Sequence, residues 1–220
     1  CLTRSYEEPQ RAVDLLRLAV EALDQVTGYQ LETSFASMFD ASNKNCRESV
    51  FELQTSMSSA NGANYRTQLH RWIGVSELWG WDEILPSEVL LKAFTREGPI
   101  ATTGGYDSRY YATLFTRCDY YNDGSGKVYG SNYDDWFEGS DKAAFRKFMP
   151  ADIDGLNANY CAINIPLMRY ANVLLLKAEA LNRQGHPERA IPLINEVRRA
   201  HGDMPPMTGT SAAEVQAQIE

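Results

Sequence analysis

Apolar residues recur at the spacing of one helical face in three segments of the chain. The first stripe predicts a helix over about residues 9–26, because Pro9 provides a start signal and Gly28 lies just beyond it. Its members are Ala12, Leu15, Leu16, Ala19, Val20 and Leu23. The second stripe ends at Gly185 and consists of Leu167, Tyr170, Ala171, Leu174, Ala178 and Leu181. The third extends from Pro187 to about residue 202 and consists of Ala190, Leu193, Ile194 and Val197.

The second and third predicted helices form a hairpin, because residues 184–186 are too short a link for any arrangement but antiparallel neighbours. Residues 187–194 also repeat residues 9–16 without a gap, as PERAIPLI against PQRAVDLL. A glycine at the turn followed five residues later by alanine, as in Gly185 and Ala190, is typical of TPR-like helix pairs. Pro192 departs from the ideal pattern. We expect TPR-like helices over residues 1–28 and 165–202, with residues 1–6 as the partner of the first helix.

A loop-rich insertion lies between the helical ends. Residues 106–154 are rich in Gly, Asn, Asp, Ser and Tyr, with turn clusters at 122–126 and 129–133. Short strands are expected beside it, notably over residues 49–54. The fold class predicted is therefore mainly α, with a few short strands. Long ordered insertions commonly carry function, since they can change without disturbing the core.

Composition and charge exclude several classes of protein. The 220 residues are 44% hydrophobic and 23% charged, which is ordinary for one globular domain. The formal net charge of −8 opposes binding to nucleic acid or to anionic membrane surfaces. No apolar run approaches the length of a membrane span, and no signal peptide is visible. The four cysteines have no metal-site spacing, and we favour free thiols over disulfides.

Aromatic residues are the main candidates for ligand contact. A flat aromatic side chain offers apolar surface to a bound ligand, while nearby polar groups can exchange hydrogen bonds with it. Burial is the commoner role of any single aromatic residue, and we expect Trp72 and the pair Tyr110–Tyr111 in the core. Turn-rich flanks favour exposure elsewhere. The expected ligand-binding residues are Trp79, Trp81, Tyr133 and Trp136.

Catalytic and metal-binding interpretations are weaker. Asp134, Asp135 and Glu138 could supply the paired carboxylates of a glycoside hydrolase, but nothing in the sequence fixes their separation. Residues 152–155 and 119–126 faintly resemble calcium loops, and turn formation explains them better because the full ligand spacing is absent. We expect no catalytic residue, no metal and no cofactor.

Several segments together resemble the SusD/RagB family of nutrient-binding outer-membrane lipoproteins. The most specific is NIPLMRYANVLLLKAEALN at residues 164–182, followed by NEVRRA at 195–200. Weaker similarities occur in the family's order at residues 48–54, 80–87, 107–109 and 146–148. The resemblance implies that residues 1–220 are an internal fragment of a single SusD/RagB-like domain, with the aromatic ligand-binding region at 48–160. The signal peptide, the lipidated N-terminus and the C-terminal part would lie outside it, and Cys1 would not be the lipidated residue.

The resemblance also implies a function. Such a protein captures a polysaccharide or oligosaccharide without chemical change at the extracellular face of the outer membrane, where a lipid anchor holds it. It then delivers this ligand to a TonB-dependent transporter. The alternative is a TPR-like scaffold for a protein or peptide, with purely structural aromatic loops. Hydrolysis is the least favoured option.

Overall fold

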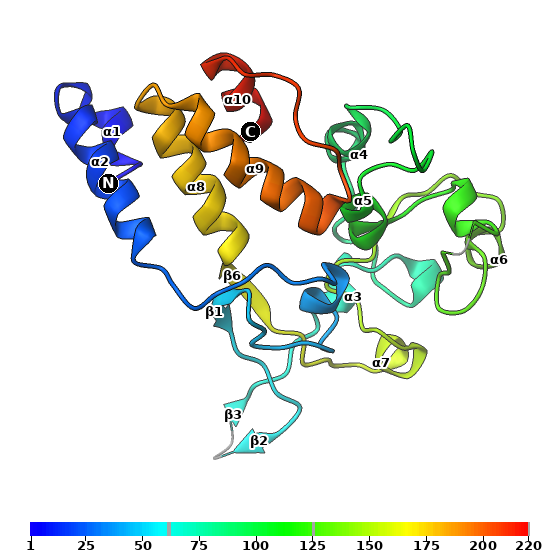
Figure 1. Cartoon of the computed structure of the whole chain (residues 1–220). Coiled ribbons are helices and arrows are strands. Elements are labelled where there is room, and N and C mark those ends of the chain that lie inside the picture. The colour runs from blue at the N-terminus through cyan, green and yellow to red at the C-terminus, as the bar shows by residue number, and fades with distance from the viewer. Residues whose placement is uncertain (61–62, 125, 220) are drawn as a thin grey trace. The chain divides into compact units, whose positions relative to one another are not determined.

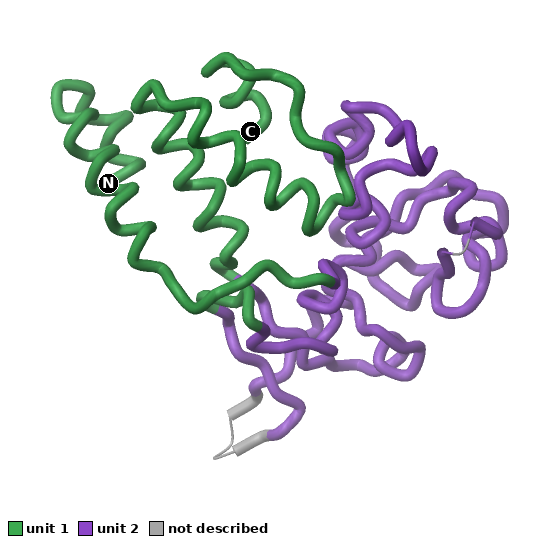
Figure 2. Tube along the Cα trace, in the orientation of Figure 1, with its two compact units in different colours: residues 1–33, 47–51, 167–220 green, residues 34–46, 52–166 purple. Residues whose placement is uncertain are grey.

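The computed structural model describes residues 1–60, 63–124 and 126–219. It divides the chain into two compact units (Figure 2). Unit 1 comprises Cys1–Thr33, Arg47–Phe51 and Leu167–Glu220, and unit 2 comprises Ser34–Cys46 and Glu52–Pro166. The chain enters and leaves each unit more than once, so neighbours in space are often distant in sequence.

Unit 1 is helical. Its elements are α1 (Arg4–Glu7), the 3-10 turn η1 (Pro9–Arg11), α2 (Ala12–Asp24), α8 (Tyr170–Arg183), α9 (Pro187–Gly202) and α10 (Ala212–Ile219). Helices α2 and α9 both pack against α8, α10 packs against α8 and α9, and α1 packs against α2 (Figure 1). The predicted helical hairpin is therefore confirmed, as is the pairing of the first helix with the segment before it.

Small residues form the centre of unit 1. Ala178 and Ala180 of α8 and Ala190 of α9 are fully buried in one cluster with residues of α2 and α10, where short side chains let neighbouring helices approach closely. Gly185 occupies the turn with φ +84°, a left-handed conformation that costs glycine little. Pro192 lies inside α9 on its exposed side.

Leu167 lies outside the helix that its spacing predicted. It belongs to strand β6 (Ile165–Arg169), which pairs with β1 (Ser49–Leu53), so helix α8 begins only at Tyr170. The side-chain oxygen of Asn172 accepts from the backbone N–H of Arg169 at 3.0 Å, which fixes this helix start. The predicted strand at residues 49–54 is confirmed over Ser49–Leu53.

A buried carboxylate joins three separate segments of unit 1. Glu48 is fully buried and accepts hydrogen bonds from His201 Nε2 at 2.8 Å, Arg169 Nη1 at 2.8 Å and the Glu32 amide at 2.7 Å. Its own carbonyl accepts from the Tyr170 amide at 2.8 Å. Glu48 thereby connects the residue before β1 to the start of α8 and the end of α9.

Short elements joined by long loops make up unit 2. They are η2 (Ala36–Phe39), β2 (Ser59–Ala60), β3 (Ala63–Asn64), α3 (Leu69–Ile73), η3 (Ser76–Leu78), α4 (Glu88–Thr95), α5 (Ser108–Thr113), β4 (Leu114–Phe115), η4 (Asp119–Tyr121), α6 (Tyr133–Phe137), β5 (Ala144–Phe145) and α7 (Ile153–Asn157). Strands β2 and β3 pair antiparallel, as do β4 and β5. The predicted mainly α fold with loop-rich insertion and few strands is confirmed.

Two further features concern the last helix and the hydropathy of the helices. Helix α10 starts with a capping box, since Ser211 Oγ accepts from the Glu214 amide at 3.3 Å and Glu214 Oε2 accepts from the Ser211 amide at 3.0 Å. Across residues 1–60, 63–124 and 126–219, no helix combines the length and apolar character required to cross a membrane.

Candidate functional site

The loop between α3 and α4 folds into a tight turn that carries two tryptophans. Trp79 has φ +55°, a left-handed conformation that is rare for a bulky residue. Gly80 lies directly against Gly74, where a Cβ atom would come within 2.0 Å of backbone atoms, so only glycine fits. The Trp81 amide then donates to the Arg71 carbonyl at 2.8 Å, which returns the chain to α3.

Two cationic side chains hold this turn from within unit 2. The buried Arg71 guanidinium donates to the carbonyl oxygens of Trp79 and, at 2.7 Å, of Asn157. Both are backbone oxygens, so the charge fixes the path of the main chain. Arg71 therefore positions Trp79 without occupying its exposed face.

Lys142 binds the same turn through side chains. Its ammonium group donates to Glu77 Oε2 at 2.9 Å and to Asp82 Oδ1 at 2.7 Å. Burial alone would raise the pKa of Asp82, but hydrogen bonds from Lys142 and Ser76 outweigh it and hold that pKa below its usual value. The two carboxylates lie on either side of Trp79 and Trp81 in sequence, so Lys142 closes the turn.

All four tryptophans of the chain gather in two edge-to-face pairs, which we name the tryptophan cluster. Trp72 and Trp81 have ring centroids 5.3 Å apart, and Trp79 and Trp136 have theirs 5.6 Å apart. Trp72, Trp79 and Trp81 keep 47%, 40% and 46% of their surface exposed. Trp136 is half-buried and its Nε1 donates to the Val128 carbonyl at 2.7 Å. Trp72, Trp79 and Trp81 thus expose a large apolar surface to solvent.

Exposure differs from expectation at two of the aromatic residues. Trp72 was expected in the core and is instead 47% exposed, with its ring in edge-to-face contact with Trp81. Tyr133 was expected to be exposed and to contact ligand. The predicted exposure is wrong, because the side chain is fully buried and stacks on Phe137 with ring centroids 4.1 Å apart. These two residues lie four apart in α6 and share its inward face. Burial of Tyr110 in the core is confirmed.

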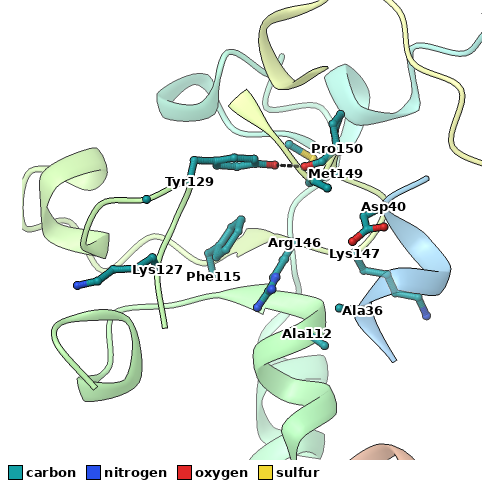
Figure 3. Close-up of a pocket in the computed structure, with 12 residues that line it drawn as sticks. Ala36, Asp40, Ala112, Phe115, Lys127, Tyr129, Arg146, Lys147, Met149 and Pro150 are labelled. Carbon is teal, nitrogen blue, oxygen red and sulfur yellow. Dashed lines mark hydrogen bonds between the residues drawn. The ribbon is translucent and has the colours of Figure 1, made fainter. Parts of the chain in front are cut away.

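A pocket of about 230 Å³ lies within unit 2 (Figure 3). Its aromatic wall is formed by Phe115 of β4 and Tyr129, whose ring centroids are 6.0 Å apart. Tyr129 also contacts Trp136 edge-to-face at 6.4 Å, so successive ring contacts lead from Trp79 through Trp136 to the pocket. The lining residues are Ala36, Asp40, Ala112, Phe115, Lys127, Tyr129, Gly130, Arg146, Lys147, Met149, Pro150 and Ala151.

Polar groups surround this aromatic wall. Arg146 lies beside the Phe115 ring, with its guanidinium carbon 5.8 Å from the ring centroid, and the Asp40 carboxylate lies beyond it (Figure 3). The amino groups of Lys127 and Lys147 point away from the two rings on opposite sides. The Tyr129 hydroxyl donates to the Pro150 carbonyl at 2.8 Å, which fixes that ring. Sequence reasoning missed this pocket, although the turn cluster at 129–133 was visible.

Two of the three acidic residues considered for hydrolysis, Asp134 and Asp135, have structural partners. Asp134 accepts from Arg117 Nε at 3.0 Å, and Asp135 Oδ2 accepts from the Asn132 amide at 2.9 Å to cap α6. Asp152 likewise caps α7, accepting from the Gly155 amide at 2.7 Å, which confirms turn formation there. Among the described residues, no group of three or more His, Cys, Asp or Glu side chains could hold a metal ion.

Helical hairpins carrying a long insertion with exposed aromatic residues define the class of protein, and comparison with known families identifies it. The chain belongs to the SusD family, whose family model matches residues 47–214. A SusD-like protein, P38 of Formosa agariphila, is 62% identical over 37 residues, which cover 17% of this chain and 7% of that protein.

Solved structures have the same fold. A SusD superfamily protein from Bacteroides vulgatus matches with a TM-score of 0.74 and 23% identity, over 97% of this chain and 44% of that chain. Surface glycan-binding protein A from Bacteroides thetaiotaomicron, solved in complex with laminarihexaose, matches with a TM-score of 0.60 and 15% identity, over 97% of this chain and 47% of that chain. The chain thus spans less than half the length of these two solved proteins.

Proposed function

We propose that the chain binds a glycan through the tryptophan cluster. The observation that carries the proposal is the exposure of 40–47% on three tryptophans, held in place by a turn with a strained backbone at Trp79. A turn without a binding role would favour Gly or Asn at such a position. Strain kept at an exposed aromatic residue points to selection for its ring. The laminarihexaose complex of a structural neighbour supports the same ligand class.

The expected gain per ring is moderate. A tryptophan side chain offers about 250 Å² in all, so 40% exposure leaves about 100 Å² for contact. A sugar that covers half of this area gains about 1.2 kcal/mol at roughly 25 cal/mol per Å². Two such contacts would supply a factor of about 50 in affinity.

The protein acts, in this proposal, as a capturing module and not as an enzyme. Asp134 and Asp135 are engaged by Arg117 and the Asn132 amide, which supports the non-catalytic interpretation. Membership of the SusD family supports a location at the outer face of the outer membrane through a lipid anchor. It also supports delivery of the bound glycan to a TonB-dependent transporter.

The binding proposal is tested with single-tryptophan variants of the chain. Trp79→Ala and Trp81→Ala are titrated by calorimetry with the best binder from a broad glycan panel. Each is expected to weaken binding about sevenfold, the equivalent of about 1.2 kcal/mol. The matched control is Phe51→Ala, which removes an aromatic ring that is 63% exposed but belongs to unit 1. Equal affinities of all three variants and the parent would overturn the proposal.

Delivery and catalysis need separate measurements. Cells that lack the gene should fail to take up a fluorescent form of the bound glycan, and the transporter should co-purify with the full-length protein from detergent-solubilised membranes. Uptake at the normal rate would exclude a role in delivery. Release of reducing sugar by the purified chain would show hydrolysis.

A further inference from the structure

The charge of the pocket beside Phe115 and Tyr129 is opposite to that of the chain. Four ionisable side chains other than tyrosine line it, three of them cationic: Lys127, Arg146 and Lys147 against Asp40. The chain as a whole has a net charge of −8. A recess lined mainly by one sign concentrates that potential and attracts ligands of the other sign. The pocket is therefore a local positive site on an acidic chain.

Arg146 is the cation placed to contact a ligand. Its Nη1 donates to the Tyr111 carbonyl at 3.0 Å and to the Tyr121 hydroxyl at 3.3 Å, both neutral oxygens. Burial raises the pKa of Tyr121 well above its usual range, so this phenol does not offset the guanidinium charge. In the described part of the chain, Arg146 has no carboxylate partner within ion-pair distance.

The two lysines contribute to the field more than to contact. Lys127 pairs with Asp123 at 2.9 Å, and Lys147 lies over the Phe39 ring with its ammonium nitrogen 4.1 Å from the centroid. Figure 3 shows both amino groups directed away from the aromatic wall. Arg146 alone of the three lies next to Phe115, and its planar guanidinium can form two parallel hydrogen bonds to a carboxylate or sulfate.

We propose that this pocket binds a sugar residue that carries an anionic substituent, either a carboxylate or a sulfate ester. The substituent binds Arg146, the ring packs against Phe115 and Tyr129, and Asp40 accepts a hydrogen bond from a hydroxyl. Asp40 Oδ1 already accepts from the Ser42 amide at 2.9 Å, which holds the carboxylate in place. This inference rests on the proposed glycan binding and names the class of glycan.

The ring contacts link the pocket to the tryptophan cluster within unit 2. Tyr129 contacts Trp136 at 6.4 Å, and Trp136 contacts Trp79 at 5.6 Å. An oligosaccharide can therefore place one residue in the pocket while its neighbours pack on exposed tryptophans. The tryptophans supply affinity for sugar rings in general, whereas Arg146 supplies selectivity for charge.

The experiment compares glycans that differ in charge. The full chain is titrated with oligogalacturonate, with the same oligosaccharide after methyl esterification, with a sulfated carrageenan oligosaccharide and with laminarihexaose. The variants are Arg146→Gln and Arg146→Lys, with Lys92→Gln as the control that removes one exposed positive charge from α4 outside the pocket. Circular dichroism verifies that each variant folds.

At least one anionic probe should bind tenfold or more tighter than the neutral probes, and its affinity should fall tenfold or more between 50 and 300 mM salt. Arg146→Gln should remove this preference, Arg146→Lys should retain part of it because the charge remains, and Lys92→Gln should leave it unchanged. The preferred anion then distinguishes carboxylate from sulfate.

Two results overturn the inference while preserving the proposed function: a neutral probe that binds best through Trp79 and Trp81, or an anionic preference that survives Arg146→Gln. Loss of the preference in Lys92→Gln as strongly as in Arg146→Gln would also overturn it, because general charge would then explain binding. Absence of binding to every glycan refutes the proposed function together with the inference.

Discussion

Replacement of Glu48 by glutamine tests how much one buried carboxylate contributes to unit 1. The side chain is fully buried and accepts three hydrogen bonds, two of them from the cationic or ionisable groups of Arg169 and His201. Glutamine keeps the size but removes the charge, and its NH₂ group must face one of these donors. A bond to a charged group is worth about 1.5–3 kcal/mol, and breaking a buried pair costs about 3–5 kcal/mol.

We expect Glu48→Gln to lower the free energy of unfolding by about 3 kcal/mol, the lower end of that range, because the Arg169 side chain is still 17% exposed. For a chain of this size, that corresponds to a fall in Tm of roughly 6–12 °C. The assay is urea and thermal unfolding followed by far-UV circular dichroism, which detects α2, α8 and α9. Tryptophan fluorescence would not suffice, since all four tryptophans lie in unit 2.

The pH dependence sharpens this prediction. Burial alone would raise the pKa of Glu48, but hydrogen bonds from His201 and the Glu32 amide, with the charges of His201 and Arg169, lower it below its usual value of 4.5. A carboxyl whose pKa is depressed by folding stabilises the protein above its unfolded pKa and loses that contribution as pH falls through its folded pKa. The difference in free energy of unfolding between parent and variant should therefore shrink as the pH falls below about 4.5.

The control for Glu48→Gln is Glu21→Gln, which removes the same charge from an exposed pair with Arg17 on α2. It should leave the unfolding midpoint unchanged, because exposed pairs of this kind contribute little. Equal midpoints for Glu48→Gln and the parent would refute the reasoning. A difference in free energy of unfolding between parent and Glu48→Gln that does not depend on pH would also refute it, because the substitution would then have removed packing and not charge.

Three further substitutions probe other features, each measured by its urea midpoint. Ala190→Leu adds bulk at a fully buried position of α9, in the hairpin with α8, and should lower the free energy of unfolding by about 1–3 kcal/mol. A smaller effect would mean that the two helices separate easily. Gly80→Ala forces a Cβ within 2.0 Å of the Gly74 backbone and should cost about 3 kcal/mol and weaken glycan binding. Asn164→Ala removes the 2.7 Å hydrogen bond from Asn164 Nδ2 to the buried Glu52 and should cost about 2–3 kcal/mol; a neutral result would show that water replaces the amide.

The helical hairpin could be predicted because its determinants are local. Most stripe residues of α8 and α9 are buried, as helix periodicity predicts, and Gly185 forms the turn through its positive φ angle. The boundary at Leu167 could not be predicted in this way. Pairing of β6 with β1, more than 100 residues earlier in the chain, decides that this residue is extended. Periodicity carries no information about such distant partners.

Distance in sequence also hid the buried ionic cluster and the pocket. His201 lies 153 positions from Glu48, and neither residue stands in a recognisable motif. The pocket takes Asp40, Phe115, Tyr129 and Arg146 from four separate segments, so no spacing rule joins them. Similarly, Trp72 is exposed and Tyr133 is buried, the opposite of what was predicted, because burial depends on which neighbours cover each ring.

The backbone at two aromatic residues of the proposed site supports a binding role independently of exposure. Trp79 and Tyr129 have φ +55° and +46°, and both belong to the ring series that leads to the pocket. Such conformations cost on the order of 1–3 kcal/mol for residues other than glycine. Gly130 follows Tyr129 at φ +87°, so the local turn already has a residue suited to a positive angle. The strained backbone at Trp79 and Tyr129 therefore supports a role for both side chains in the proposed site.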